Sequence, residues 1–304
     1  MGLPAPHLKF IVQRVKKYKF IGPVLTLGNQ DIYATAQNIE GLLAKEKIEF
    51  SRLEKILHSV SSDIPKINKE AANYIHAKTF FEFLGIKEED YYDIDKFPFD
   101  RPKILHDLQS PVDSKFHDFF NFIIDSGTLE HIFDIKSVME NIVRMAKIGG
   151  YVLQILPAQN FLNHGFYQFS PTFFHDFYTD NGFEIVEAYL IEIRGRVQRF
   201  HKYNQARDYV GLSFKPGNRL LNCFLVRKKN QVETIMSPDQ YFYKKLSEDG
   251  AAVEHDFNKN VFDRLVSSLR KIVPIRFHGL FFRAWTFMKR ISRRREYFDL
   301  SHKW

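Results

Sequence analysis

The chain lacks the features that mark secreted and membrane-spanning proteins. Its 304 residues include one cysteine, Cys223, which cannot form an internal disulfide and which favours a reducing compartment. No run of about eighteen apolar residues occurs, so we expect no transmembrane helix. The first residues are lysine-rich and interrupted by prolines, unlike the apolar centre of a signal peptide. We therefore expect a cytoplasmic protein.

Several catalytic signatures are also missing. There is no Gly-x-x-x-x-Gly-Lys phosphate loop and no Gly-x-Ser-x-Gly elbow, so nucleotide hydrolysis and serine hydrolysis are not expected. The 12 histidines form no His-Glu-x-x-His or His-x-His pair, and a single cysteine excludes a cysteine-rich zinc site. From these spacings we expect no metal site.

Composition and charge indicate one main domain with an extension. A hydrophobic content of 44% is enough for one sizeable core. The net charge of +8 is concentrated in residues 270–304, where lysine and arginine far outnumber acidic residues. A basic tail on an otherwise neutral chain suggests a separate binding surface rather than an anionic substrate. We predict an N-terminal segment at 1–19, a domain at 20–230 and a C-terminal helical basic extension at 231–304.

The most informative stretch predicts a strand, a helix and a second strand. Residues 122–131 read as an apolar strand that opens into a polar loop, and residues 148–157 repeat this pattern. Between them, residues 135–146 have helical apolar spacing, and Gly149-Gly150 supplies a turn. Such crossovers make the two strands parallel, and ligands bind at the carboxyl ends of parallel strands. The loops after both strands are therefore the first candidates for a site.

The rest of the chain continues the alternation of strands and helices. Ser170-Pro171 is a typical helix start, and Asn181-Gly182 a typical end. We expect strands near residues 24–27, 91–94, 103–105, 119–124, 151–156, 184–190 and 220–226, and a further helix at 68–84. This pattern predicts an α/β fold with a Rossmann-like, mostly parallel sheet that is covered by helices on both faces.

Three of these elements together carry a resemblance to a known family. Pro23-Val-Leu-Thr-Leu-Gly-Asn-Gln-Asp31 reads as a first strand with its ligand-binding turn, and Leu129-Glu130-His131 and Gly149-Gly150 follow in order. In this respect the chain resembles the class I S-adenosylmethionine-dependent methyltransferases, in particular the type 11 group, as far as about Lys228. The resemblance implies a sheet of that family and S-adenosylmethionine as the cofactor.

The resemblance also implies a set of cofactor-binding residues. Gly28 and Asn29 would form the cofactor turn, and Asp93, with Asp95 as the alternate, would hold the ribose hydroxyls. Asp107 would face the adenine. The three consecutive residues that would face the methionine part are Asp125, Ser126 and Gly127.

Two features depart from the family pattern. Only Gly28 remains of a turn that usually has more glycine. The acidic residues lie much further along the chain than the spacing of about 20 residues typical of dinucleotide folds, which implies an insertion. Residues 36–66 have an amphipathic helical pattern, which we interpret either as a lid over the site or as extra helical packing.

The acceptor side of the predicted site is polar and aromatic. Methyl transfer to a hydroxyl requires alignment of the acceptor and removal of a proton, for which histidine is suited. His131 and His164 are the two candidates for this base, and Asn163, Tyr167 and Gln168 are predicted to bind a small-molecule or sugar-like acceptor. Two alternatives stay open: a catalytically silent binding protein with this fold, and a nicotinamide-dependent oxidoreductase.

The basic tail includes an amphipathic helical pattern at residues 280–294. Its apolar residues gather on one side and its basic residues on the other. Such a helix can lie on an anionic membrane surface as a peripheral anchor, or it can pack on the core or on a second subunit. Nothing in the sequence reads nucleic-acid bases, so we expect no specific nucleic-acid partner.

Overall fold

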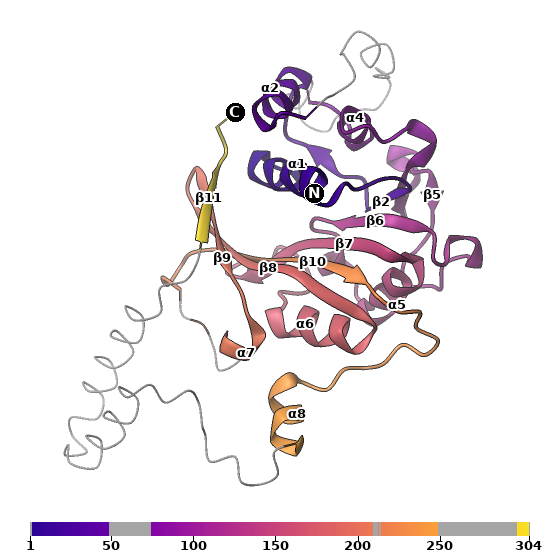
Figure 1. Cartoon of the computed structure of the whole chain (residues 1–304), viewed down its shortest axis with the longest axis vertical. Helices are drawn as coiled ribbons and strands as arrows, with labels where there is room; N and C mark the ends of the chain where they lie inside the picture. Colours follow the sequence, from indigo (N-terminus) through magenta and orange to yellow (C-terminus); the bar gives the residue numbers. More distant parts are fainter. Residues whose placement is uncertain (1, 49–73, 209–211, 213, 249–296, 304) are drawn as a thin grey trace, which may run out of the picture.

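The computed structural model describes residues 2–48, 74–208, 212, 214–248 and 297–303. Within this part of the chain, nine strands form one sheet in the order β11-β9-β8-β10-β7-β6-β2-β4-β5. A second, two-stranded sheet pairs β1 (Gly2–Leu3) with β3 (Asp31–Ile32). Figure 1 shows the large sheet running through the middle of the molecule, with helices above and below it.

Five strands form the parallel half of the large sheet. They are β2 (Val24–Leu27), β4 (Tyr91–Asp95), β5 (Ile104–Leu105), β6 (Phe120–Asp125) and β7 (Ala146–Gln159). Each lies where the sequence predicts a strand. Numbered along the chain, they run 3-2-1-4-5 across the sheet, the order that begins a doubly wound nucleotide-binding fold.

The other half of the sheet is antiparallel, so the prediction of a mostly parallel sheet is wrong. This half consists of β8 (Phe183–Arg194), β9 (Val197–Lys202), β10 (Leu220–Lys228) and β11 (Tyr297–Ser301). β10 pairs antiparallel with both β7 and β8, and β9 pairs antiparallel with β8 and β11. Only two residues join β8 to β9, and Gly195 there has a φ of 58°. So short a connection permits only a hairpin.

Helices cover both faces of the sheet, as predicted (Figure 1). On one face lie α1 (Ala5–Tyr18), α2 (Ala36–Glu46) and α4 (Ala77–Phe83), and on the other α5 (Ile135–Met145) and α6 (Pro171–Asp180). Local signals explain the starts of α5 and α6, where the side chains of Asp134 and Ser170 accept hydrogen bonds from backbone N–H groups of the first turn. Two hydrophobic cores result, one on each side of the sheet.

The N-terminal segment predicted at 1–19 belongs to the same core. In α1, Leu8, Phe10 and Ile11 are fully buried, and the ring of Phe10 stacks on that of Phe200 with centroids 5.2 Å apart. Arg14 forms a 2.8 Å ion pair with Glu187 of β8. These contacts attach the first helix directly to the antiparallel half of the sheet.

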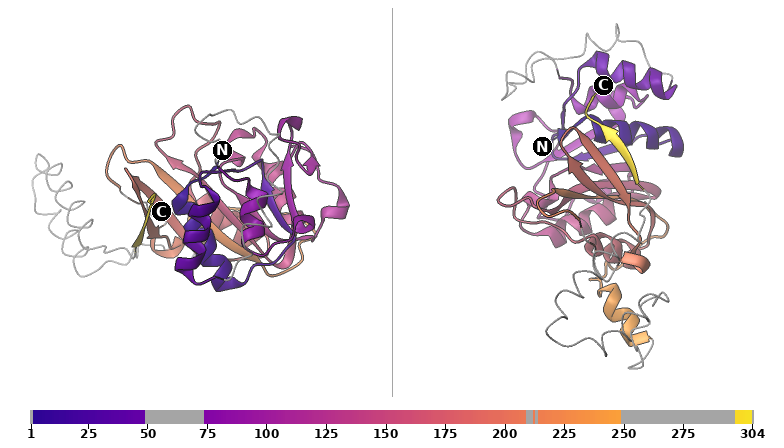
Figure 2. Two further views of the ribbon diagram at one scale, coloured as in Figure 1. Left: turned by 90° about the horizontal axis from the view of Figure 1, so that it is seen from above. Right: turned by 90° about the vertical axis from the view of Figure 1, so that its left-hand side faces the viewer.

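The end of the chain also returns to the sheet. β11 adds an edge strand beside β9, and Phe298 stacks on Phe200 with centroids 4.9 Å apart. The views in Figure 2 show β11 beside β9. The described part of 231–304 therefore includes a strand as well as the helix α8 (Tyr241–Glu248), which the predicted C-terminal helical basic extension did not anticipate. The amphipathic pattern at 280–294 lies outside the described residues, as do residues 49–66 of the predicted lid.

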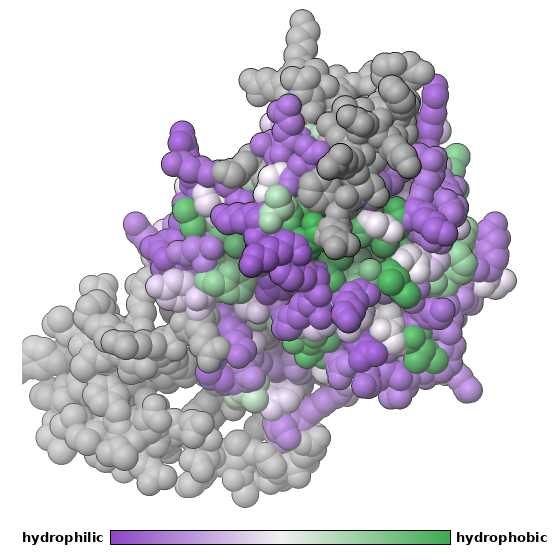
Figure 3. Space-filling model, turned by 45° about the horizontal axis from the view of Figure 1, so that its top comes forward, coloured by the Kyte–Doolittle hydropathy of each residue, from purple (hydrophilic) through white to green (hydrophobic). Residues whose placement is uncertain are grey.

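The remaining elements are short. They are α7 (Gln205–Asp208) and the 3-10 helices η3 (Glu88–Asp90), η4 (Pro98–Asp100), η5 (Ser114–Phe116) and η6 (Leu129–His131). On the face drawn in Figure 3, hydrophobic side chains near the centre lie between hydrophilic ones. Among the described residues, none of the helices has the length and apolar character needed to span a bilayer.

Candidate active site

The carboxyl ends of the parallel strands bring the predicted site residues to one edge of the sheet. Gly28 follows β2, Asp95 ends β4, Asp107 follows β5, Asp125 ends β6, and the loop of residues 160–170 follows β7. Because all five strands are parallel, their carboxyl ends share this edge. The order of the strands therefore brings residues as far apart in the sequence as Gly28 and the loop 160–170 to one edge of the sheet.

The turn after β2 is built around Gly28. Its φ is +69°, a region that favours glycine, and its N–H donates to the carbonyl of Ile94 at 2.8 Å. A Cβ added at this position would lie 2.8 Å from the hydroxyl of Thr128. That hydroxyl donates to the Leu27 carbonyl at 2.6 Å, and the buried amide of Gln30 donates to the same oxygen at 2.7 Å. The side chains of Thr128 and Gln30 thus both bind the carbonyl of the last residue of β2, a feature that the sequence did not reveal.

Asp95, rather than Asp93, lies beside this turn. The Asp95 carboxylate accepts hydrogen bonds from the main-chain N–H groups of Asn29, at 3.4 Å, and Phe97, at 2.9 Å. Asp93 is paired across the sheet with Thr26, inside the strand, and its carboxylate accepts a 2.7 Å hydrogen bond from the N–H of Lys103. The alternate residue of the sequence prediction is therefore the one at the end of the strand.

Asp107 lies one strand further along the same edge. Its carboxylate forms a 2.8 Å ion pair with Lys96 and accepts a hydrogen bond from the N–H of Gln109 at 3.0 Å. The hydrogen bond from Lys96 and that from the Gln109 backbone hold the pKa of this carboxyl below its usual range. Asp107 is therefore an ionised acceptor at neutral pH.

Asp125 is a buried support of the loop that follows β6. It is completely buried, and it accepts hydrogen bonds from the N–H of Thr128 at 2.9 Å and the amide of Gln154 at 3.2 Å. Burial raises the pKa of Asp125 to about 6, although these hydrogen bonds oppose the shift. Ser126 is also buried, and Gly127 has a φ of +97°. Asp125 therefore shapes the loop from within the core.

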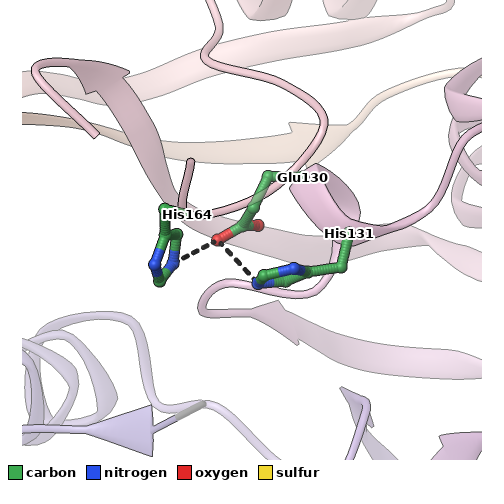
Figure 4. Close-up of side chains that lie close together, drawn as sticks. All are labelled: Glu130, His131 and His164. Atoms are coloured by element: carbon green, nitrogen blue, oxygen red, sulfur yellow. Dashed lines mark ion pairs between the residues drawn. The ribbon is translucent and has the colours of Figure 1, made fainter. Parts of the chain in front are cut away.

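Beyond this loop, Glu130 lies between two histidine rings (Figure 4). Its Oε1 is 3.6 Å from Nε2 of His164 and 3.9 Å from Nε2 of His131. Glu130 is only 1% exposed, whereas both histidines are exposed. Burial, and next the charge of Asp125, raise the pKa of Glu130 to about 8, while burial and the neighbouring His164 lower the pKa of His131. The two predicted bases, His131 and His164, thus lie close together. Glu130, which the sequence singled out only as part of the Leu-Glu-His element, lies between them.

The predicted acceptor residues lie in the loop of residues 160–170, and two of them support it. The Tyr167 hydroxyl donates to the carbonyl of Phe133 at 2.8 Å, and the side-chain oxygen of Gln168 accepts from the N–H of Phe161 at 2.8 Å. Asn163 is exposed, with a φ of +60°. The exposed side chains of Phe133 and Phe166 meet edge-to-face nearby, with ring centroids 5.7 Å apart. The rim beside His164 is therefore polar and aromatic, as the sequence predicts.

The doubly wound order of the parallel half changes after its fifth strand. The 3-2-1-4-5 order is continued by an antiparallel strand, β10, inserted between β7 and β8. In the doubly wound dinucleotide-binding order 3-2-1-4-5-6, the sixth strand lies directly beside the fifth. The sheet differs from the dinucleotide-binding order at this point.

Comparisons with known proteins find similarity at the level of solved structures. No family model and no curated protein matches the chain. An S-adenosylmethionine-dependent methyltransferase from Aquifex aeolicus is 11% identical, with a TM-score of 0.36, and the match covers 74% of this chain and 90% of that one. A Burkholderia thailandensis 1,6-didemethyltoxoflavin N1-methyltransferase, with S-adenosylhomocysteine bound, is 10% identical, with a TM-score of 0.36 and coverages of 73% and 77%.

A third similar structure is that of a synthase. The branched-chain polyamine synthase of Thermus thermophilus, in complex with 5'-methylthioadenosine, is 12% identical, with a TM-score of 0.38 and coverages of 79% of this chain and 62% of that one. The chain spans 52% of the matched chain of the citrinin polyketide synthase CMeT domain. All these TM-scores are below 0.5, so no function is inferred from these similarities.

Proposed function

We propose that this chain is an S-adenosylmethionine-dependent methyltransferase that acts on a hydroxyl of a small-molecule or sugar-like acceptor. The observation that carries the proposal is the meeting of Gly28 and Asp95 at the carboxyl edge of the sheet. The carboxylate of Asp95 lies against the turn and accepts a 3.4 Å hydrogen bond from the N–H of Asn29, although the two residues are 66 positions apart in the sequence. A glycine turn beside an acidic strand end suits an adenosine with its two ribose hydroxyls.

The residues at this edge fit the cofactor in chemical character. Asp95 supplies a carboxylate for the ribose hydroxyls, and the ionised Asp107 supplies an acceptor on the adenine side. Asn29 lies at the turn, and the buried Asp125 holds the loop containing Ser126 and Gly127 at the methionine side. When bound, S-adenosylmethionine would supply a methyl group that is activated by its sulfonium centre.

The acceptor side is supported by the rim around His164 and His131. Both imidazoles are exposed and border the buried Glu130, so they are within reach of a molecule bound at the edge. Removal of a hydroxyl proton is a task that suits a neutral imidazole. Phe133 and Phe166 offer apolar surface for the body of the acceptor, and Asn163 an amide for its polar groups.

A second candidate function is a catalytically silent protein that keeps this fold. It is favoured by one observation: Thr128 and the buried Gln30 both donate to the carbonyl of Leu27 and close the end of β2. In that case the turn is held together by the protein's own side chains and needs no ligand.

Calorimetry with S-adenosylhomocysteine and with NAD separates these functions. We expect S-adenosylhomocysteine to bind with a Kd in the range of about 1 to 100 μM, and NAD not to bind. Binding of neither ligand would favour the silent protein. Binding of NAD alone would favour the nicotinamide-dependent oxidoreductase and would remove the methyltransferase.

A further inference from the structure

A buried carboxylate and two imidazoles converge at the edge of the sheet. Glu130 and His131 come from η6, which follows β6, and His164 comes from the loop after β7 (Figure 4). One ligand atom from each residue lies within 4.8 Å of those of the other two. The segments that follow two neighbouring parallel strands, β6 and β7, therefore bring these residues into one compact set of ligand atoms.

The carboxylate of Glu130 is buried without a hydrogen bond from the described residues. Both of its oxygens are buried and accept no such bond. The nearest imidazole nitrogens, at 3.6 and 3.9 Å, are too far away to donate one. Ionising a buried carboxyl that has no hydrogen-bond partner is costly, so a positive group between it and the imidazoles would stabilise its charged form.

The backbone holds the donor set in place. The carbonyl of Glu130 accepts hydrogen bonds from the N–H groups of Phe166, at 2.8 Å, and Tyr167, at 3.3 Å. Gly165 permits this close approach, since a Cβ added there would lie 2.7 Å from the same carbonyl. The loop that carries His164 is therefore fastened to the main chain of Glu130. This attachment of the loop to the Glu130 main chain fixes the distance between the side chains of Glu130 and His164.

The spacing of the donor atoms suits a metal ion at their centre. Metal–nitrogen and metal–oxygen bonds of about 2.0–2.2 Å place neighbouring ligand atoms roughly 3 Å apart. The separations of 3.6 and 3.9 Å are slightly larger. Small rotations of the two exposed imidazoles would bring their nitrogens to bonding distance. The buried Glu130 need not move.

We propose that Glu130, His131 and His164 bind one divalent transition-metal ion, such as Mn²⁺, Co²⁺ or Zn²⁺. Two imidazoles and one carboxylate favour such ions over Mg²⁺ and Ca²⁺, which prefer oxygen ligands. Three protein ligands leave coordination positions open for an oxygen atom of water or of a bound molecule. This site differs from the expectation of no metal site, because the three residues form no short spacing motif in the sequence.

The metal would give the site a chemical preference. A bound divalent ion would polarise a coordinated hydroxyl and make its proton easier to release to water. The ion would replace the imidazole base of the metal-free site, because a nitrogen bound to the ion cannot accept a proton. This consequence rests on the methyl transfer proposed above, and it narrows the acceptor to a molecule whose hydroxyl, with or without a neighbouring oxygen, can coordinate the ion. Binding of the ion itself does not depend on that function.

Titration of the metal-stripped, tag-free full chain with Co²⁺ tests the proposal. We expect one equivalent to bind, seen by visible absorption of the coordinated ion, and calorimetry with Mn²⁺ and Zn²⁺ to give the same stoichiometry. Glu130→Gln, His131→Ala and His164→Ala should each weaken binding by about tenfold or more. His117→Ala is the matched control, because His117 is exposed at the amino end of β6, opposite the proposed site.

Thermal unfolding supplies a second readout. The ion should raise the Tm of the wild type and of His117→Ala, but not that of His164→Ala, which lies on an exposed loop where the substitution leaves the core intact. No binding by the wild type at about 1 mM ion would overturn the proposal. Equal binding by the wild type and the three variants would do the same. Metal binding without S-adenosylhomocysteine binding would keep the metal site and remove the methyltransferase.

Discussion

The hydroxyl of Thr128 occupies the space that a side chain at residue 28 would need. A Cβ on Gly28 would lie 2.8 Å from this oxygen, which in turn donates to the carbonyl of Leu27 at 2.6 Å. The turn after β2 and the loop after β6 are therefore packed directly against each other and joined by this hydrogen bond. Glycine is required here by the protein's own packing as well as by its φ of +69°.

Gly28→Ala should consequently destabilise the protein by about 1–3 kcal/mol, since it adds backbone strain and a contact with Thr128. Urea unfolding measures the change in the free energy of unfolding. Gly85→Ala is the matched control, because Gly85 has a φ of +85° but no described atom within 4 Å of an added Cβ. An equal loss in both variants would show that the contact with Thr128 contributes nothing.

Asp95→Asn should weaken S-adenosylhomocysteine binding by about 1–3 kcal/mol, because the amide cannot replace the charged acceptor of two hydroxyl groups. Asp93→Asn is the comparison on the same strand, and we expect it to leave affinity nearly unchanged, since Asp93 lies inside the strand opposite Thr26 and not at its end beside the Gly28 turn. Calorimetry on both variants checks this. Loss of affinity in Asp93→Asn alone would instead assign the ribose hydroxyls to Asp93, the first choice from the sequence.

Glu187→Gln should lower the free energy of unfolding at pH 7 by about 1–3 kcal/mol. The carboxylate of Glu187 pairs with Arg14 and with Lys17, both at 2.8 Å, and accepts a 2.6 Å hydrogen bond from the hydroxyl of Tyr18. It thereby attaches α1 to β8. Glu184→Gln on the same strand is the control. Its ion pairs are longer and more exposed, so less than about 1 kcal/mol should be lost.

The contribution of Glu187 should also depend on pH. Burial alone raises the pKa of this carboxyl, but the hydrogen bonds from Lys17 and Tyr18 and the charge of Arg14 outweigh burial and lower it to about 2. Because the folded-state pKa lies below the unfolded value of 4.5, the stabilisation is complete above pH 4.5 and is lost as pH falls toward 2. Urea unfolding between pH 7 and the acid limit of folding should show the wild type and Glu187→Gln converging. A constant difference would contradict this assignment.

Phe298→Ala should destabilise the protein by roughly 2 kcal/mol, because it removes a ring that packs against the core on the α1 side of the sheet. Phe298 stacks on the buried Phe200 and meets Tyr189 edge-to-face at 5.3 Å. Tyr297→Ala, which alters an exposed neighbour on the same strand, should cost less. Thermal unfolding of both variants measures the difference. Equal stability of Phe298→Ala and the wild type would mean that β11 adds nothing to the core.

The parallel half of the fold could be predicted from local patterns in the sequence. Mainly apolar runs such as 119–124 and 151–156 predict buried strands, and β6 and β7 lie at these positions, because strands covered on both faces are rich in apolar residues. Ser170-Pro171 likewise marks the start of α6, since a capping hydroxyl and a fixed φ act locally. The candidate loops after β6 and β7 follow from the same local signals.

Which residues lie in contact depends on the packing of segments that are far apart in the sequence. Whether Asp93 or Asp95 borders Gly28 depends on the register of β4 against β2, which a single sequence does not specify. α1 packs on the sheet through Phe10 and Arg14, and β11 packs on it through Phe298. These elements lie at the two ends of the chain, and their contacts join residues too far apart in the sequence for a local pattern to predict. Glu130, His131 and His164 form one donor set only because β6 and β7 are parallel neighbours whose carboxyl ends share one edge.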